Sequence, residues 1–186
     1  MRNAADLALL GILTTVGSLG VVTAGAAVAT ASAAVHDWHG GDAAWPSLRV
    51  TLRRYLRGLL PGILPALIAV VGAALLTVNL SAITRGVVPG GAPLAVATIA
   101  LMAAAAGYAG IAVVEVGRQG GTGWRAAAGS AYRIAQRRPA AVLAGAGVIA
   151  LVVALGLMII PVLTPVLTGY AILALHAVTR RLAPSS

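Results

Sequence analysis

The segment Ser47–Pro65, SLRVTLRRYLRGLLPGILP, places four arginines directly before a long apolar run. Its larger apolar side chains recur at the spacing of one helical face, and the arginines lie off that face (Leu48, Leu52, Tyr55, Leu56 and Leu59; Arg49, Arg53, Arg54 and Arg57). This pattern is typical of an amphipathic helix that lies in a membrane surface with its arginines among the lipid headgroups. Pro61 and Pro65 are expected to bend the chain into the apolar run that follows.

The composition of the whole chain agrees with a membrane location. Of the 186 residues, 60% are hydrophobic and 9% are charged, whereas a soluble domain carries roughly 25% charged residues. The 13 basic residues are all arginine, and with four acidic residues they give a net charge of +9. Because these arginines flank apolar stretches, we expect no nucleic-acid partner. The absence of cysteine excludes disulfides and thiolate chemistry.

Five apolar stretches follow one another along the chain, over about residues 4–35, 59–83, 93–117, 139–160 and 162–178. A helix needs about 20 apolar residues to cross a bilayer. We therefore predict an all-α fold, in the form of a polytopic helical membrane protein. It has five transmembrane helices and two cytoplasmic amphipathic elbow helices, and residues 1–186 form a single integral membrane domain.

The first stretch is too long for one straight span. Its middle, GSLGVVTAGAA (Gly17–Ala27), combines three glycines with a β-branched run, and both lower helix propensity. A break is therefore expected around three residues (Gly20, Thr23 and Gly25). Both a kinked span and a helical hairpin fit this pattern. A signal peptide cleaved after Ala31-Ser32-Ala33 is a rival interpretation, which the length of the apolar region and Asp6 disfavour.

The arginines also predict an orientation, because short cytoplasmic loops of membrane proteins are enriched in them. They are concentrated before the second stretch, between the third and fourth stretches, and at the C-terminus, whereas the opposite side has only Arg2 and Arg85. We expect a multi-pass protein of the bacterial inner (plasma) membrane, with both basic segments and the C-terminus in the cytoplasm. The side of the N-terminus depends on whether the first stretch is a span or a hairpin.

The second basic segment repeats the plan of the first. A Gly-Gly pair, a tryptophan, an arginine and a proline recur in the same order about 80 residues apart (Gly40-Gly41, Trp45, Arg57 and Pro61; Gly120-Gly121, Trp124, Arg137 and Pro139). This order predicts a parallel internal repeat. The arginines of the two segments either fix the topology alone or also contact a protein partner or anionic lipid (Arg49, Arg53, Arg54, Arg57, Arg125, Arg133, Arg137 and Arg138).

Few other polar residues suggest chemistry. One metal-ligand spacing occurs in a glycine-rich turn, where solvation alone explains it (His36, His39 and Asp42). Glu115 is expected to pair with Arg118 on the same helix, and His176 to pack near the end of the last stretch. The sequence has no phosphate-binding loop, Ser-His-Asp order or carboxylate pair. We therefore expect no enzymatic activity and no cofactor.

Two blocks of the sequence resemble the YesL family, bacterial membrane proteins built around a domain of unknown function. The run DLALLGILTTVGSLGVVTAGAAVATASAAV (6–35) contains the Val22-Thr23-Ala24-Gly25 step of that family, followed by Ala29. The run GWRAAAGSAYRIAQRRPAAVLAGAGVIAL (123–151) resembles its second block. The chain departs from the family in having few aromatic residues, and in having Gly20 where a proline is usual. The resemblance implies an association with carbohydrate uptake, since members often accompany sugar ABC transporters.

Together, the resemblance and the basic segments favour a non-enzymatic accessory or regulatory membrane subunit of a carbohydrate ABC transporter, in contact with its permease or ATPase and with membrane lipids. Two alternatives remain open. A small stand-alone transporter would need a polar cavity within the membrane (Thr14, Thr15, Thr23 and Asn79), and a structural or lipid-binding scaffold would need only the arginines. Small residues in the spans suit close packing, and they also suit a homo-oligomer (Ala103, Ala106, Gly107, Gly110, Ala144, Gly145 and Gly147).

Overall fold

A computed structural model describes residues 2–17, 20–39, 48–158 and 164–182. Over these residues the chain forms seven helices, which confirms the all-α part of the predicted fold class. The helices are α1 (Arg2–Gly17), α2 (Val21–His39), α3 (Leu48–Thr84), α4 (Gly91–Arg118), α5 (Trp124–Arg137), α6 (Pro139–Met158) and α7 (Thr164–Leu182). Within the described part of the chain, α3, α4 and α6 are long and apolar enough to cross a membrane.

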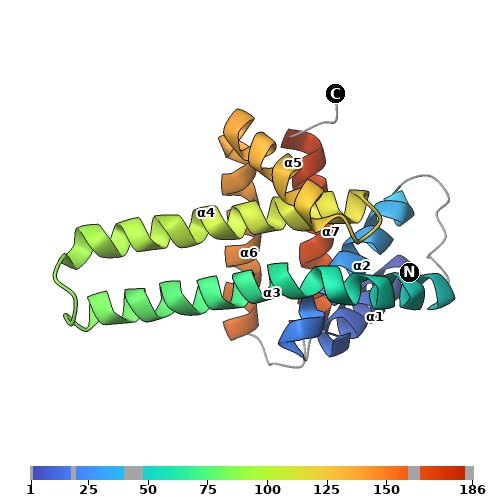
Figure 1. Ribbon diagram of the computed structural model, residues 1–186, viewed down its shortest axis with the longest axis horizontal. Helices are drawn as coiled ribbons and strands as arrows, with labels where there is room; N and C mark the ends of the chain where they lie inside the picture. Colours follow the sequence, from blue (N-terminus) through green and yellow to red (C-terminus); the bar gives the residue numbers. More distant parts are fainter. Residues whose placement is uncertain (1, 18–19, 40–47, 159–163, 183–186) are drawn as a thin grey trace.

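Helices α3 and α4 lie side by side as a long hairpin that projects well beyond the other helices (Figure 1). We call residues 67–105 of this hairpin the arm. Glycines close its tip, since Gly86 and Gly90 have φ angles of 74° and 137°, which other residues rarely adopt. The large apolar side chains of the arm are exposed on both helices (Leu67, Ile68, Val70, Val71, Leu75, Val78, Val87, Val96, Ile99 and Leu101).

Helix α2 is the most enclosed helix, and small residues make this possible. Ala26, Ala29 and Ala33 are completely buried. A Cβ atom added to Gly25 would overlap the carbonyl oxygen of Gly62 on α3. One built on Gly62 would in turn lie 2.7 Å from the Ala26 backbone nitrogen. The backbones of α2 and α3 therefore touch, which is the usual role of small residues between membrane helices.

Helix α4 uses its glycines in the same way, each against a different helix. Gly107 contacts the backbone of Val142 on α6, Gly110 contacts Leu175 on α7, and Gly117 contacts Ser32 on α2. The Ser32 hydroxyl also donates a hydrogen bond of 2.6 Å to the carbonyl oxygen of Val113. Thus α4 links the arm to the body of the protein, which consists of α1, α2, α5, α6 and α7.

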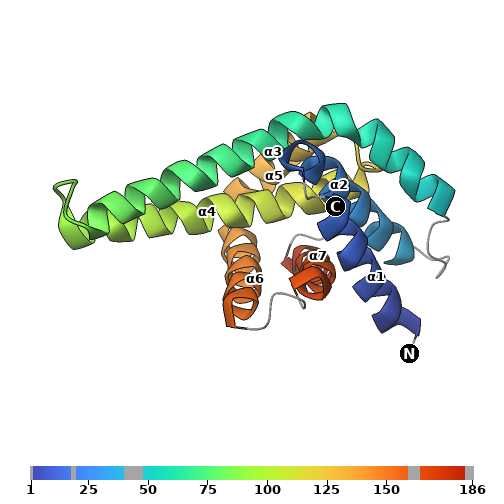
Figure 2. The same cartoon turned by 90° about the horizontal axis from the view of Figure 1, so that it is seen from below.

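Helices α6 and α7 cross the hairpin steeply rather than running beside it (Figures 1 and 2). The fourth and fifth predicted stretches do form helices, with α6 ending at Met158 and α7 beginning at Thr164. Because of the steep crossing, α6 and the arm do not lie side by side as parallel spans in this conformation.

Two details of the predicted elements need correction. The first basic segment is not a separate elbow helix, because α3 is continuous through Pro61 and Pro65 and is only bent in its N-terminal half (Figure 2). Prolines bend a helix without ending it when neighbouring contacts support the freed backbone groups. The second basic segment does form a separate helix, α5. The first apolar stretch forms two helices in mutual contact, α1 and α2, as in a hairpin rather than one kinked span.

The contact between Gly25 and Gly62 generates a first prediction. Gly25→Ala should lower the free energy of unfolding in mild detergent by about 1–3 kcal/mol, because the added methyl group forces α2 away from α3. Gly72→Ala is the matched control, since nothing lies within 4 Å of a Cβ at that position. The control should be neutral or stabilising by up to about 1 kcal/mol. Equal melting temperatures for the two variants would contradict the close contact.

Candidate functional site with two basic surfaces

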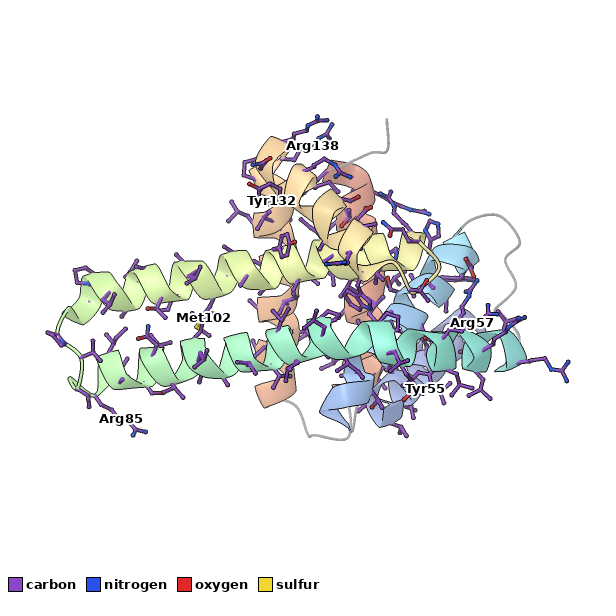
Figure 3. The ribbon with its side chains drawn as sticks, in the orientation of Figure 1. Tyr55, Arg57, Arg85, Met102, Tyr132 and Arg138 are labelled. Atoms are coloured by element: carbon purple, nitrogen blue, oxygen red, sulfur yellow. The ribbon has the colours of Figure 1, made fainter. Side chains whose placement is uncertain are left out.

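The first basic surface lies at the N-terminal end of α3. Arg49, Arg53 and Arg57 are exposed there, and Figure 3 shows Arg57 at the end of α3 opposite to Arg85. Arg54 differs from them, because its Nη1 atom lies 2.5 Å from Oδ2 of Asp37 on α2. The sequence could not show this pairing. Three of the four predicted arginines thus face outward, and one holds α3 against α2.

Exposed leucines accompany these arginines. Leu52 and Leu56 are more than half exposed, and Leu60 is 81% exposed. The face of α3 that packs against the protein is a different one, formed by Gly58, Gly62 and Ala66. Of the apolar face expected from the sequence, Leu52 and Leu56 point away from the protein. Tyr55, in contrast, is partly buried and donates a hydrogen bond of 3.3 Å to the Gly17 carbonyl oxygen. Leucines four residues apart continue the exposed apolar face towards the arm, so the first basic surface combines charged and apolar side chains.

The second basic surface is formed by α5. The helix is strongly amphipathic, with Ala127 and Ala131 buried and Arg125, Arg133 and Arg137 exposed. Tyr108 of α4 fastens it by donating a hydrogen bond of 3.0 Å from Oη to the Ala128 carbonyl oxygen. Trp124 packs against Ala29, Val116 and Ala127. Tyr132, on the same helix, is 57% exposed.

Arg138 connects this surface to the C-terminal helix. It follows α5 directly, and its Nη1 atom donates a hydrogen bond of 2.5 Å to the carbonyl oxygen of Leu182 at the end of α7. Arg180 and Arg181 lie in the same last turn of α7. The sequence indicated these two arginines only as a cationic end to the last span. The hydrogen bond that links Arg138 to this turn joins residues 44 positions apart, which no local pattern reveals.

The described carboxylates do not neutralise either surface. Glu115 is buried and accepts a hydrogen bond of 2.8 Å from Arg118, as its spacing predicted. Asp37 binds Arg54. The remaining exposed arginines of the two surfaces have no ion pair among the described residues (Arg49, Arg53, Arg57, Arg125, Arg133, Arg137 and Arg138). These positions are suited to contact an anionic partner.

The metal-ligand spacing of His36, His39 and Asp42, which solvation alone explains, lies only partly within the described residues. The ring of His36 lies near that of His176 on α7, with 6.4 Å between centroids, and His176 is buried with Nδ1 3.0 Å from Ile172 O. Asp42 and the side chain of His39 lie outside the described residues. No group of three metal-ligating side chains occurs among those that the structure does describe.

Three residues were expected to break the first stretch. Gly20 lies in the bend before α2, and its carbonyl oxygen accepts a hydrogen bond of 2.8 Å from the Thr23 hydroxyl. Thr23 and Gly25 lie within α2 itself. The contact of Gly25 with Gly62 gives that glycine a role in packing.

The polar residues that a transport cavity would need do not come together. Thr14 and Thr15 donate hydrogen bonds to the carbonyl oxygens of Leu10 and Gly11 in their own helix. Asn79 lies on the arm, where it donates a hydrogen bond of 3.1 Å to the Thr98 hydroxyl of the facing helix. Ser81, in contrast, bonds within its own helix. These hydroxyl and amide groups therefore support helices locally.

Comparison with known proteins adds no relative, since the chain matches no protein-family model, no curated protein and no solved structure. The resemblance to the YesL family therefore stays a prediction.

Proposed function

We propose that this protein is a non-enzymatic accessory or regulatory membrane subunit. Its arm inserts into the bilayer, and its first basic surface binds a protein partner at the cytoplasmic side. The observation that carries the proposal is the continuous row of exposed leucines on α3, which begins among arginines without carboxylate partners and runs into the arm. Such a surface offers both charge and apolar area to a partner that extends from the cytoplasm into the membrane.

The exposed apolar side chains of the arm support its insertion into lipid. Ten large apolar side chains on it are about half exposed or more. Burying such a side chain completely is worth about 1.5–3 kcal/mol, so leaving all ten in water would cost on the order of 10–20 kcal/mol. A bilayer or a partner must therefore cover the arm.

The arm also agrees with the proposed orientation. Its tip carries Arg85, whereas the opposite ends of α3 and α4 carry Arg57 and Arg118 (Figure 3). The excess of arginine at the base favours the base as the cytoplasmic end. If the protein has five spans, α6 must cross the bilayer beside the arm. It would then have to change its orientation, because in this conformation it runs steeply across the hairpin. The orientation of α6 is accordingly part of the test.

The parallel repeat receives support from the packing. The most extensive contacts between helices join α2 with α3 and α4 with α6. Each pair meets at glycines, Gly25 with Gly62 in the first and Gly107 with Gly145 in the second. These glycines are separated by about 80 residues from one pair to the other, as the repeat requires. The two units differ in one respect. In the first, α3 is one continuous helix, whereas the second has the separate helices α5 and α6 in its place.

The natural absence of cysteine allows the orientation to be tested with single-cysteine variants. A maleimide that does not cross membranes should label Arg85→Cys on intact cells, and Gln136→Cys of α5 only after the cells are permeabilised. The reverse pattern would contradict the orientation. Met158→Cys at the end of α6 reports on the span number: labelling on intact cells supports five spans, and labelling only after permeabilisation shows that α6 does not cross.

The resemblance to the YesL family supplies the class of partner, a carbohydrate ABC transporter. A scaffold that binds only lipid is the second candidate, since the same arginines suit headgroups. A stand-alone transporter is disfavoured because its polar residues do not converge. The absence of any catalytic arrangement in the sequence supports the non-enzymatic part of the proposal.

The partner is tested by isolating the tagged full chain from its own membranes in mild detergent and identifying bound proteins by mass spectrometry. We expect a sugar permease or its ATPase in near-stoichiometric amount. Arg53→Glu with Arg57→Glu should reduce its recovery about tenfold, because each exposed ion pair contributes up to about 1 kcal/mol and reversal adds repulsion.

Arg85→Glu is the matched control, since it reverses an exposed arginine at the other end of the hairpin. It should leave the partner in place. The labelling pattern of each variant shows whether its orientation is intact. A chain recovered alone, or only with copies of itself, would contradict the accessory function and favour the scaffold.

A further inference from the structure

Two pairs of arginines lie at the C-terminal ends of α5 and α7, and one hydrogen bond connects these ends. Arg137 is the last residue of α5 and Arg138 follows it, while Arg180 and Arg181 lie in the last turn of α7. The hydrogen bond from Arg138 to Leu182 O joins the two helix ends. All four side chains belong to exposed residues. We call this group the C-terminal arginine cluster.

The groups around the cluster offset only part of its positive charge. A helix C-terminus is equivalent to roughly −0.5 elementary charge, so the ends of α5 and α7 together offset roughly one of the four positive charges. The described carboxylates are engaged elsewhere, Asp37 with Arg54 and Glu115 with Arg118. An excess of roughly three positive charges therefore remains, which favours a ligand with more than one negative charge.

An apolar surface begins directly beside the cluster. Helix α6 starts at the residue after Arg138, and Leu143, about one turn further, is 70% exposed. Leu151 and Val153 continue as exposed apolar side chains along the same helix. Tyr132 lies on α5, as Figure 3 shows together with Arg138. Exposed tyrosines are typical of the boundary between headgroups and acyl chains.

We propose that the C-terminal arginine cluster binds the phosphate groups of an anionic phospholipid, whose acyl chains contact the exposed apolar side chains of α6. Guanidinium groups form paired hydrogen bonds with phosphate oxygens. An acidic protein segment would match the charge but would leave the adjoining apolar surface of α6 uncovered. A lipid with two phosphates matches both. The inference rests on the proposed membrane location, and it does not depend on a protein partner.

Native mass spectrometry of the full chain in mild detergent tests this site with two defined lipids, tetraoleoyl cardiolipin and dioleoyl phosphatidylcholine. Cardiolipin should bind at least about tenfold more tightly than phosphatidylcholine, because only it offers net negative charge to the arginines. Arg137→Gln with Arg181→Gln should weaken cardiolipin binding roughly 25-fold, since each arginine near a headgroup contributes roughly a factor of five. This variant leaves the bond of Arg138 to Leu182 unchanged.

Arg49→Gln with Arg57→Gln is the matched control, because it removes the same charge from the first basic surface. It should change cardiolipin binding by less than about threefold. Equal loss in both double variants would overturn the site and indicate attraction by net charge alone. Equal binding of the two lipids by the unchanged protein would also overturn it, and this comparison does not depend on any variant being folded. Recovery of a transporter subunit is measured in a separate experiment. Either proposal, the lipid site or the accessory function, can therefore be contradicted without the other.

Discussion

The close contact of α2 with its neighbours is the constraint on which the rest of the structure depends. Gly25 and Gly62 allow the backbones of α2 and α3 to touch, and Ser32 reaches the backbone of α4 beside Gly117. Between lipid-facing helices, association depends on such packing and on interhelical hydrogen bonds, because apolar side chains gain little by leaving lipid for protein. With α3 and α4 both held by α2, their far ends must pair with each other and project as the arm.

This arrangement explains why the charged residues collect where they do. The body gathers the ends of α3, α4, α5 and α7, and each of these ends carries arginines, whereas the tip of the arm carries only Arg85. The body thus presents two basic surfaces, one with leucines of α3 and one with the apolar side of α6. Among the described residues, Asp37 and Glu115 are engaged by other arginines, and the pair of Arg54 and Asp37 joins α3 to α2.

Much of the fold could be predicted from the sequence, since apolar length and helical spacing are local properties. The bounds of α4 and α6 lie within two residues of the predicted stretches, and the pairing of Glu115 with Arg118 follows from spacing alone. The continuity of α3 through Pro61 and Pro65 could not be predicted, because it depends on tertiary support. The hydrogen bond of Arg138 to the end of α7 could not be predicted either, because it depends on how α5 lies across α4. The eight arginines of the basic segments were predicted to contact a partner or anionic lipid, and this use remains a prediction.

The most direct test of the central contact is a disulfide between α2 and α3. A Cβ atom built on Gly58 lies 3.6 Å from the Cβ of Ala26, which is close to the roughly 3.8 Å that a disulfide requires. Oxidation of the Ala26→Cys, Gly58→Cys double variant in native membranes should give a cross-linked chain of altered electrophoretic mobility. The pair Ala26→Cys, Gly72→Cys should stay reduced. Failure of the first pair to cross-link, or equal cross-linking of both, would contradict the packing of α2 that this account places at the centre of the structure.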